Sequence, residues 1–445
     1  MRIFGEAPDI KDITENNSLI KIKEILKDYF NNEFDKKFIP GVTPVPLMTN
    51  TPYGHQEVLS AIESMLSTHL TLNIAKDSKV QQFERGWSSY IGTKNGIMVN
   101  SGSSANLLSL FILANPTMSN HIKKDDEIIT PAVTWHTTVS PIISIGAVPV
   151  LVDISMDDLT IKTDEIEKHI NEKTKAIMPV HLLGNPCNMD KIMELANKYN
   201  LYVIEDTCEA HGSSFNGNRS GSIGDIGTFS FFFCHHLTTI EGGMIVTNND
   251  EIAELARIMR SQGVIRNTIN RKELEEHYNN QGYADIDKSF LFANLGFNLR
   301  PTEINGSFGI EQLKKFGNVL DQRIENGKFW ENNLRKYEDY FYIPHHFDSG
   351  SSWYGFALIV KPDAPFKRED IISHLNKCKI ETRPIMAGNI TLQPAMKYFK
   401  YKAGNLQNAD IVHSNGFFWG NHQEIKSAQR EYVLECIDQF INKIG

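Results

Sequence analysis

Residues 201–212, LYVIEDTCEAHG, join a short apolar run, Leu201–Ile204, to the two acids Glu205 and Asp206. An apolar run of this length is typical of a buried strand. Further runs of the same kind are Gly96–Val99, Glu127–Thr130, Val148–Val152 and Ala176–Val180. Amphipathic stretches, such as Ser104–Leu113 and Met189–Lys198, lie between them. Strands that alternate with helices predict an α/β fold whose large, mostly parallel sheet is covered on both faces.

The chain divides by composition into three parts. Residues 1–43 form a polar N-terminal extension with a helical pattern around Ile20–Phe30, and residues 44–300 form the large domain. A polar stretch at about 260–289 reads as a surface insertion in that domain. A long helical pattern from Thr302 to about Tyr337 then leads into a smaller α+β C-terminal domain, so that residues 301–445 are the third part.

Composition excludes several classes of protein. The 445 residues carry a net charge of −9, and 41% of them are hydrophobic. No apolar run approaches the ~18 residues of a membrane helix, and no basic stripe indicates nucleic acid. The first residues lack the apolar core of a secretory signal, so we expect a cytoplasmic protein. Five widely spaced cysteines without a CxxC pair indicate reduced thiols rather than disulfides, a zinc site or an iron–sulfur cluster.

Two glycine- and serine-rich segments have different meanings. Residues 100–106, NSGSSAN, follow a strand and open a helix, where backbone N–H groups and hydroxyls can surround a phosphate. A plain capped helix start would explain the same pattern. In residues 221–227, GSIGDIG, the glycines fall at every third position, which is not the dinucleotide pattern G-x-G-x-x-G. We therefore exclude a Rossmann dehydrogenase.

Asp206 stands at the end of a buried strand, which is a poor place for an acid without a partner. One explanation is that its carboxylate binds a protonated ring nitrogen, as pyridoxal enzymes require. The other explanation is that it caps the following helix. The residues alone leave both open.

The segments SGSSAN (101–106), EDTCEAHG (205–212), GSIGDIGTFSF (221–231) and HHLTTIEGG (235–243), in this order and spacing, resemble the DegT/DnrJ/EryC1/StrS sugar aminotransferase family. The resemblance runs from about Pro44 to Phe440. It implies the pyridoxal-phosphate-dependent transferase fold type I, which is the aspartate aminotransferase fold. Where this family carries its cofactor-binding lysine, five residues after Ser230, this chain has His235. No lysine lies between Lys198 and Lys272.

A histidine at this position is similar to the branch of sugar 3-dehydratases that act on GDP- or CDP-linked 4-keto-6-deoxy sugars. The segments SWYGF (352–356) and TRPIMAGNITLQP (382–394) resemble the same branch. The branch works with pyridoxamine phosphate, formed from pyridoxal phosphate and an amino donor such as L-glutamate, in dideoxysugar synthesis for surface polysaccharide. His235 would then move protons without trapping the cofactor. The alternatives are a sugar-nucleotide 4-aminotransferase that works without the lysine and an inactive ligand-binding homologue.

The resemblance also implies roles for single residues. Asp206 pairs with the ring nitrogen, Trp135 stacks on the ring, and Glu209 stands where many relatives have a glutamine facing the ring hydroxyl. Asn298 extends to the phosphate of a neighbouring subunit, which implies a homodimer with shared sites. The phosphate itself is held by Gly102, Ser103, Ser104 and Ser230.

Two departures from the family pattern bear on the site. Ile240 replaces the glycine before Glu-Gly-Gly, which concerns the backbone beside the ring. The insertion carries no cysteine, so we expect turnover through an amino donor and no iron–sulfur cluster.

For Trp135, the alternative to stacking on the ring is a position in the hydrophobic core.

Overall fold

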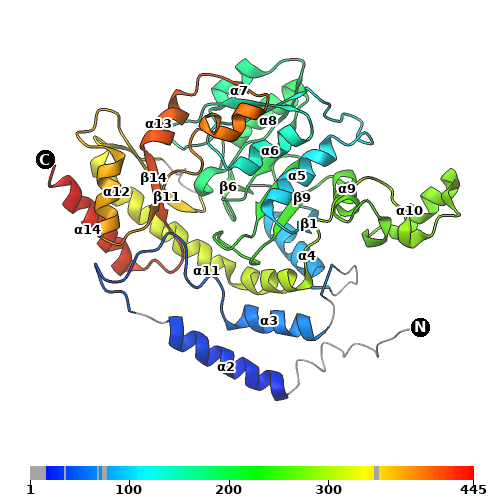
Figure 1. The fold of residues 1–445 in the computed structure, drawn as a ribbon, viewed down its shortest axis with the longest axis horizontal. Coiled ribbons are helices and arrows are strands. Elements are labelled where there is room, and N and C mark those ends of the chain that lie inside the picture. Colours follow the sequence, from blue (N-terminus) through cyan, green and yellow to red (C-terminus); the bar gives the residue numbers. More distant parts are fainter. Residues whose placement is uncertain (1–16, 35–36, 68–69, 73–77, 345–349, 445) are drawn as a thin grey trace. The chain divides into compact units, whose positions relative to one another are not determined.

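A computed structural model describes residues 17–34, 37–67, 70–72, 78–344 and 350–444 (Figure 1). These residues form two compact units. The first unit combines the described residues up to Lys37 with Thr51–Leu108 and Ser230–Phe316. The second combines Phe38–Asn50, Ser109–Phe229 and the described residues from Gly317 onward. The division into an extension, a large domain and a small domain stays a prediction.

The first unit is built around an antiparallel strand pair. β1 (Asn95–Val99) pairs with β9 (Gly243–Thr247), and α4 (Lys79–Ile91) and α9 (Asp250–Arg260) pack against them. A buried ion pair of 2.6 Å between Arg260 and Glu84 joins the two helices. The other helices of this unit are α2 (Asn17–Phe34), α3 (His55–Leu66), α10 (Arg271–Tyr278) and the first part of α11 (Glu303–Leu334).

The insertion predicted at about 260–289 contains α10, none of whose side chains is buried. Val264 and Ile265, which precede α10 in the same segment, are buried, so a surface location for the whole insertion stays a prediction. The long helix predicted from Thr302 to about Tyr337 is confirmed as α11.

The second unit holds a parallel sheet. Its strands follow the spatial order β8 (Ile226–Ser230), β5 (Tyr202–Asp206), β4 (Thr174–Ile177), β2 (Glu127–Pro131), β3 (Val148–Val152) and β13 (Lys402–Ala403). Each neighbouring pair is parallel. The sequence prediction of a mostly parallel sheet is therefore confirmed. The last residue of β8, Ser230, is the point where the chain enters the first unit again.

Helices pack on this sheet as the alternating pattern predicts. α6 (His136–Ser144) contacts β2 and β3, α7 (Thr163–His169) contacts β3, and α8 (Met189–Tyr199) contacts β4 and β5 (Figure 1). α8 begins where the Asn188 side chain accepts the N–H of Lys191, and it ends at Asn200 in the left-handed conformation. The α/β class of this unit thus follows from its local sequence signals.

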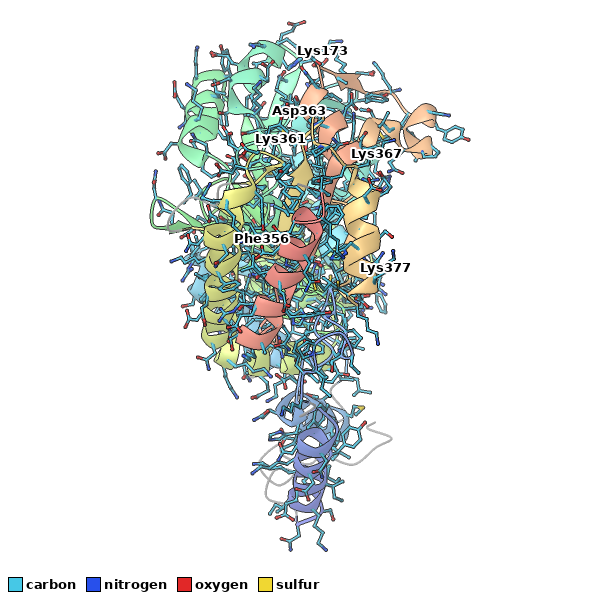
Figure 2. The ribbon with its side chains drawn as sticks, turned by 90° about the vertical axis from the view of Figure 1, so that its left-hand side faces the viewer. Lys173, Phe356, Lys361, Asp363, Lys367 and Lys377 are labelled. Carbon is cyan, nitrogen blue, oxygen red and sulfur yellow. The ribbon has the colours of Figure 1, made fainter. Side chains whose placement is uncertain are left out.

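A small antiparallel sheet completes the second unit, with the strand order β10 (Phe341–Tyr342), β11 (Gly355–Val360), β14 (Gly416–Gly420) and β12 (Thr382–Arg383). Its helices are α12 (Arg368–Lys377), α13 (Gln407–Asn415) and α14 (Ser427–Ile441). Figure 2 shows Phe356 of β11 between α11 and α14, with Lys367 and Lys377 at the two ends of α12. The Phe356 ring lies 5.0 Å from the Trp419 ring in a core that also includes Trp330. Burial of these aromatic side chains stabilises the packing of the small antiparallel sheet against its helices.

Among the described helices, none combines the length and the apolar composition that crossing a bilayer requires.

Candidate active site

The segment after β1 forms a candidate phosphate site within the first unit. α5 (Gly102–Leu113) begins at Gly102, and the Ser101 hydroxyl caps it by accepting the N–H of Ser104 at 3.1 Å. A Cβ added to Gly102 would lie 2.3 Å from the Cβ of Ser230, so only glycine fits. The structure therefore brings the helix N-terminus and the Ser230 hydroxyl side by side, with Ser103 exposed at the same place. Hydroxyls and N–H groups at a helix N-terminus are a suitable donor set for a phosphate.

His235 lies on a loop of the first unit that closes on itself. The N–H of Phe231 donates to the carbonyl of Gly242 at 2.8 Å, and the N–H of Thr239 donates to the carbonyl of Phe231 at 2.9 Å. His235 is partly exposed as a residue, whereas His236 is only 3% exposed. Of the two adjacent histidines, His235 is thus the one that can meet a ligand.

A side chain of α11 clamps this loop around Ile240. The Asn305 side-chain amide donates to the carbonyls of Thr239 and Glu241, at 2.9 and 3.0 Å. Ile240, between these two carbonyls, has a φ of +70°. A β-branched residue rarely adopts this left-handed conformation, which glycine adopts freely. The backbone conformation at position 240 therefore suits the glycine of the family pattern, and isoleucine adopts it only with strain.

Asp206 is the candidate ring-binding residue of the second unit. It ends β5, where Thr228 of β8 is its partner in the parallel ladder. The Thr138 hydroxyl donates to Oδ2 of Asp206 at 2.8 Å, and the N–H of Cys208 donates to Oδ1 at 3.2 Å. Its carboxylate is thus fixed from both sides at the carboxyl end of a parallel strand, where ligands of such sheets bind.

A buried brace that the sequence analysis did not identify supports Asp206 from the preceding residue. Glu205 accepts the N–H groups of Gly221, Ile223 and Gly224 at 2.7–2.8 Å. It also accepts Nε2 of His181 at 3.0 Å, and both of these side chains are fully buried. Because the N–H of Cys187 donates to Nδ1 of His181, that ring is neutral and carries its proton on Nε2. An acid inside a buried strand was the available signal, and it applied to Glu205 as much as to Asp206.

Trp135 and Glu209 also belong to the second unit. Trp135 directly precedes α6 and is 58% exposed, which contradicts a core position for this tryptophan and leaves its flat ring available for stacking. Glu209 follows Asp206 on the loop after β5, and its Oε2 accepts the N–H of Leu183 at 2.9 Å. Burial and the nearby Asp206 carboxylate raise the pKa of Glu209 to about 8.

Asn298 is exposed in the first unit. Its backbone bridges to Ser261, and its Oδ1 accepts Nε of Arg300 at 3.0 Å. A reach toward a second subunit stays a prediction for this residue.

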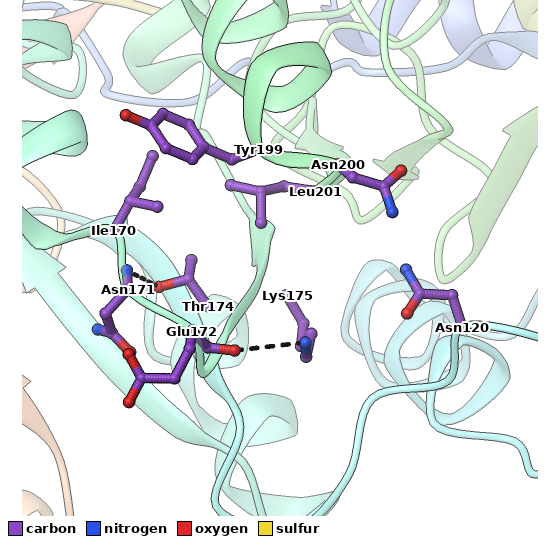
Figure 3. A pocket seen from close by; sticks show the side chains of 9 residues that line it. All are labelled: Asn120, Ile170, Asn171, Glu172, Thr174, Lys175, Tyr199, Asn200 and Leu201. Atoms are coloured by element: carbon purple, nitrogen blue, oxygen red, sulfur yellow. Dashed lines mark hydrogen bonds between the residues drawn. The ribbon is translucent and has the colours of Figure 1, made fainter.

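A cavity of about 410 Å³ lies elsewhere in the second unit, beside the amino ends of β4 and β5. Figure 3 shows its polar lining, including Asn120, Lys175 and Asn200. Lys175 donates to the carbonyl of Glu172 at 3.4 Å. This cavity is at the opposite strand ends from Asp206, so it is separate from the candidate site. Within the described part of the chain, no cluster of three or more His, Cys, Asp or Glu side chains is suited to a metal ion.

The second unit has a parallel sheet with a fixed acid at one strand end, and the first unit has a helix N-terminus lined by hydroxyls. Both features occur in pyridoxal-phosphate-dependent transferases of fold type I, the class to which the matches below assign the chain. Residues 55–438 match the model of the DegT/DnrJ/EryC1/StrS aminotransferase family, and the chain belongs to this family. The resemblance noted in the sequence is therefore confirmed.

Similar proteins with assigned activities include sugar dehydratases. The chain is 36% identical over 401 residues to a GDP-4-keto-6-deoxy-D-mannose 3-dehydratase of Yersinia pseudotuberculosis, covering 88% of this chain and 98% of the relative. A crystal structure of a GDP-4-keto-6-deoxymannose-3-dehydratase variant with bound GDP-perosamine superposes with a TM-score of 0.81 at 34% identity, covering 88% of this chain and all of that chain. Another structure of this enzyme contains a trapped PLP–glutamate geminal diamine. It superposes with a TM-score of 0.79 at 34% identity, covering 88% of this chain and 99% of that one.

Proposed function

We propose that this protein is a pyridoxamine-phosphate-dependent 3-dehydratase of a nucleotide-linked 4-keto-6-deoxy sugar. The single observation that carries the proposal is His235, which replaces the lysine of the family pattern. It lies on a loop whose ends are joined by the backbone hydrogen bond between Phe231 and Gly242. The similarity to 3-dehydratases supports the same reaction. We place the reaction in the cytoplasm, in dideoxysugar synthesis for surface polysaccharide, with L-glutamate as the amino donor.

The residues present fit the cofactor. Gly102, whose missing side chain leaves the helix start open beside Ser230, would hold the phosphate together with Ser103, Ser104 and Ser230. Asp206 would hold the ring nitrogen, because its carboxylate is fixed by Thr138 and Cys208. The exposed face of Trp135 would stack on the ring. When bound, the cofactor supplies an electron sink for loss of the C3 hydroxyl.

His235 supplies an imidazole nitrogen that accepts a proton and returns it to a departing hydroxyl. Imidazole has an unperturbed pKa of about 6.5, which suits both directions of transfer near neutral pH. A lysine at this position would bind the cofactor covalently and compete with the amine form. The histidine avoids this competition and keeps the base.

Asn298 supports a homodimer within the same proposal. Its side chain is exposed, and the family resemblance assigns it to the phosphate of a neighbouring subunit. Glu209 completes the set of proposed cofactor contacts. The insertion contains no cysteine, which supports renewal of the amine form by glutamate rather than by a cluster-dependent reductase.

Mass spectrometry of one incubation tests the proposal. The protein is mixed with pyridoxal phosphate, L-glutamate and a GDP-linked or CDP-linked 4-keto-6-deoxy sugar. We expect a product that keeps its carbonyl and lacks one hydroxyl oxygen. Nitrogen in place of the keto oxygen would instead make the protein a 4-aminotransferase, and no product with either nucleotide would favour a ligand-binding homologue.

The variant His235→Lys separates these outcomes further. We expect it to attach the cofactor covalently, seen as a mass increase that persists after borohydride has reduced the linkage to a secondary amine, and to lose dehydration. His277→Lys is the matched control, because His277 is exposed on α10 and contacts Gln281. Dehydration by His235→Lys at the parent rate would show that His235 is not the base.

A further inference from the structure

The side chain of Gln312 joins three segments of the first unit. It belongs to α11 and is only 4% exposed. Its Oε1 accepts the N–H of Thr238 at 3.3 Å. Its Nε2 donates to the carbonyl of Pro52 at 3.0 Å and to Oε1 of Glu57 at 2.7 Å. One amide thus links the His235 loop to the segment that leads into α3.

The groups around this amide fix its orientation. The N–H of Thr238 is a donor, whereas the Pro52 carbonyl and the Glu57 carboxylate are acceptors. Rotation of the amide by half a turn would place donor against donor and acceptor against acceptor. Gln312 therefore forms a rigid link with a single satisfied arrangement.

Glu57 anchors the far end of the link. It is fully buried in the first turn of α3, where its Oε2 accepts the N–H of Gly54 at 2.8 Å, as the acid of a capping box does. Its Oε1, which accepts from Gln312, also forms an ion pair with Lys315 on the next turn of α11. A buried carboxylate with these partners has little freedom to move, so it gives the amide a fixed point of attachment.

Thr238 connects the near end of the link to the rest of the His235 loop. Its buried hydroxyl donates to the carbonyl of Phe231 at 3.1 Å and accepts the N–H of Ile240 at 2.9 Å. Phe231 is the residue whose N–H joins the ends of the loop, and Ile240 is its strained residue. Because His235 lies between Phe231 and Thr238 in the chain, a shift of Thr238 changes the support of the histidine.

We propose that Gln312 is a positioning residue for His235, because its amide fixes the His235 loop to the start of α3 and so sets where the imidazole stands. The inference rests on the proposed function, since it takes His235 to be the base. A base must lie within hydrogen-bond reach of the proton that it accepts, and a displacement of about 1 Å is able to lower a rate about 100-fold. Loss of the link should therefore lower kcat and leave KM nearly unchanged.

An exchange of the two linked side chains tests the inference by rescue. Gln312→Glu keeps an acceptor for Thr238 but places a carboxylate against that of Glu57, and we expect kcat to fall roughly 10- to 100-fold with KM within about twofold. In the double variant Glu57→Gln/Gln312→Glu, an amide again donates to a carboxylate, and that carboxylate accepts the N–H of Thr238. We expect its kcat to return to within about tenfold of the parent. A double variant no more active than Gln312→Glu would overturn the inference.

Gln322→Glu is the matched control on the same helix. Gln322 lies ten residues, or about 15 Å, further along α11, and its Nε2 donates to Oε2 of Glu325 at 3.2 Å. Its replacement brings two carboxylates together in the same way, and we expect kcat within about twofold of the parent. A loss equal to that of Gln312→Glu would trace the effect to charge on α11 and overturn the inference.

A measurement without sugar separates this inference from the proposed function. In the His235→Lys background, the rate of covalent attachment of pyridoxal phosphate reads the position of residue 235. Gln312→Met keeps the length of the side chain without an N–H donor, and we expect it to slow attachment about tenfold while Tm stays within about 5 °C. Slower attachment in a chain whose parent dehydrates no sugar would refute the proposed function and support the positioning of residue 235. Equal attachment rates in a chain whose parent does dehydrate the sugar would overturn the inference and leave the proposed function standing.

Discussion

The end of β5 and the His235 loop hold their functional side chains in opposite ways. At the end of β5, the buried Glu205 carboxylate is surrounded by backbone N–H groups and by His181, and none of the residues from Glu205 to Glu209 has a positive φ. In the His235 loop, neutral amide and hydroxyl bonds hold a backbone that is strained at Ile240. In the first region, the hydrogen bonds converge on one side chain, that of Glu205. In the second region, several weaker hydrogen bonds hold the backbone, and one residue has a strained conformation. We therefore expect the two regions to respond differently to substitution.

Glu205→Gln should have the largest effect. The glutamine keeps the shape but replaces one acceptor oxygen with an NH₂ group, which faces N–H donors that it cannot satisfy. We expect a loss of about 3 kcal/mol or more in the free energy of unfolding, measured in urea. Glu194→Gln is the control, because Glu194 is exposed on α8 and pairs with Lys191, and it should stay within about 0.5 kcal/mol. Similar losses in both variants would mean that the buried brace does not support β5.

Asn305→Ala should have an intermediate effect on the other region. It removes the donors to the carbonyls on either side of Ile240, and we expect a loss of about 1–2 kcal/mol together with a lower kcat. Asn333→Ala on the same helix is the comparison, since Asn333 donates to the carbonyl of Phe329 one turn away. A kcat equal to that of the parent would show that the clamp does not position His235.

Ile240→Gly should have the smallest effect, and of the opposite sign. Glycine adopts a φ of +70° without strain, so we expect a gain of about 1 kcal/mol, seen as a higher Tm. Lys379→Gly provides a parallel measurement, because Lys379 is exposed in the second unit and has a φ of +59°. A destabilised Ile240→Gly, with Lys379→Gly stabilised, would mean that the isoleucine side chain contributes more than its backbone costs.

Local sequence signals predicted most of the second unit. The predicted strand Val148–Val152 coincides with β3, and the predicted helix Met189–Lys198 ends one residue before α8 does. The predicted strand Ala176–Val180 is shifted, because β4 is Thr174–Ile177. Pro179 has no N–H for the ladder, which accounts for the early end of that strand.

The chemistry of the candidate site was less accessible from sequence. Its residue types followed from motifs, but their partners are distant in the chain. Thr138, which fixes Asp206, lies 68 positions before it, and His181 lies 24 positions before Glu205. The φ of Ile240 and the exposure of Trp135 depend on such tertiary contacts and have no local signature. Hydrophobic periodicity reports which face of an element is buried, and it carries no information on pairs of this kind.

The contact between Gly102 and Ser230 limits which residue types position 102 can accept. A Cβ at position 102 would have to occupy the place of the Ser230 side chain, 2.3 Å away, in the segment where α5 starts. In a library with every codon at this position, selection for cofactor binding should therefore return glycine alone. Position 103, whose serine is exposed, should tolerate several small polar residues under the same selection.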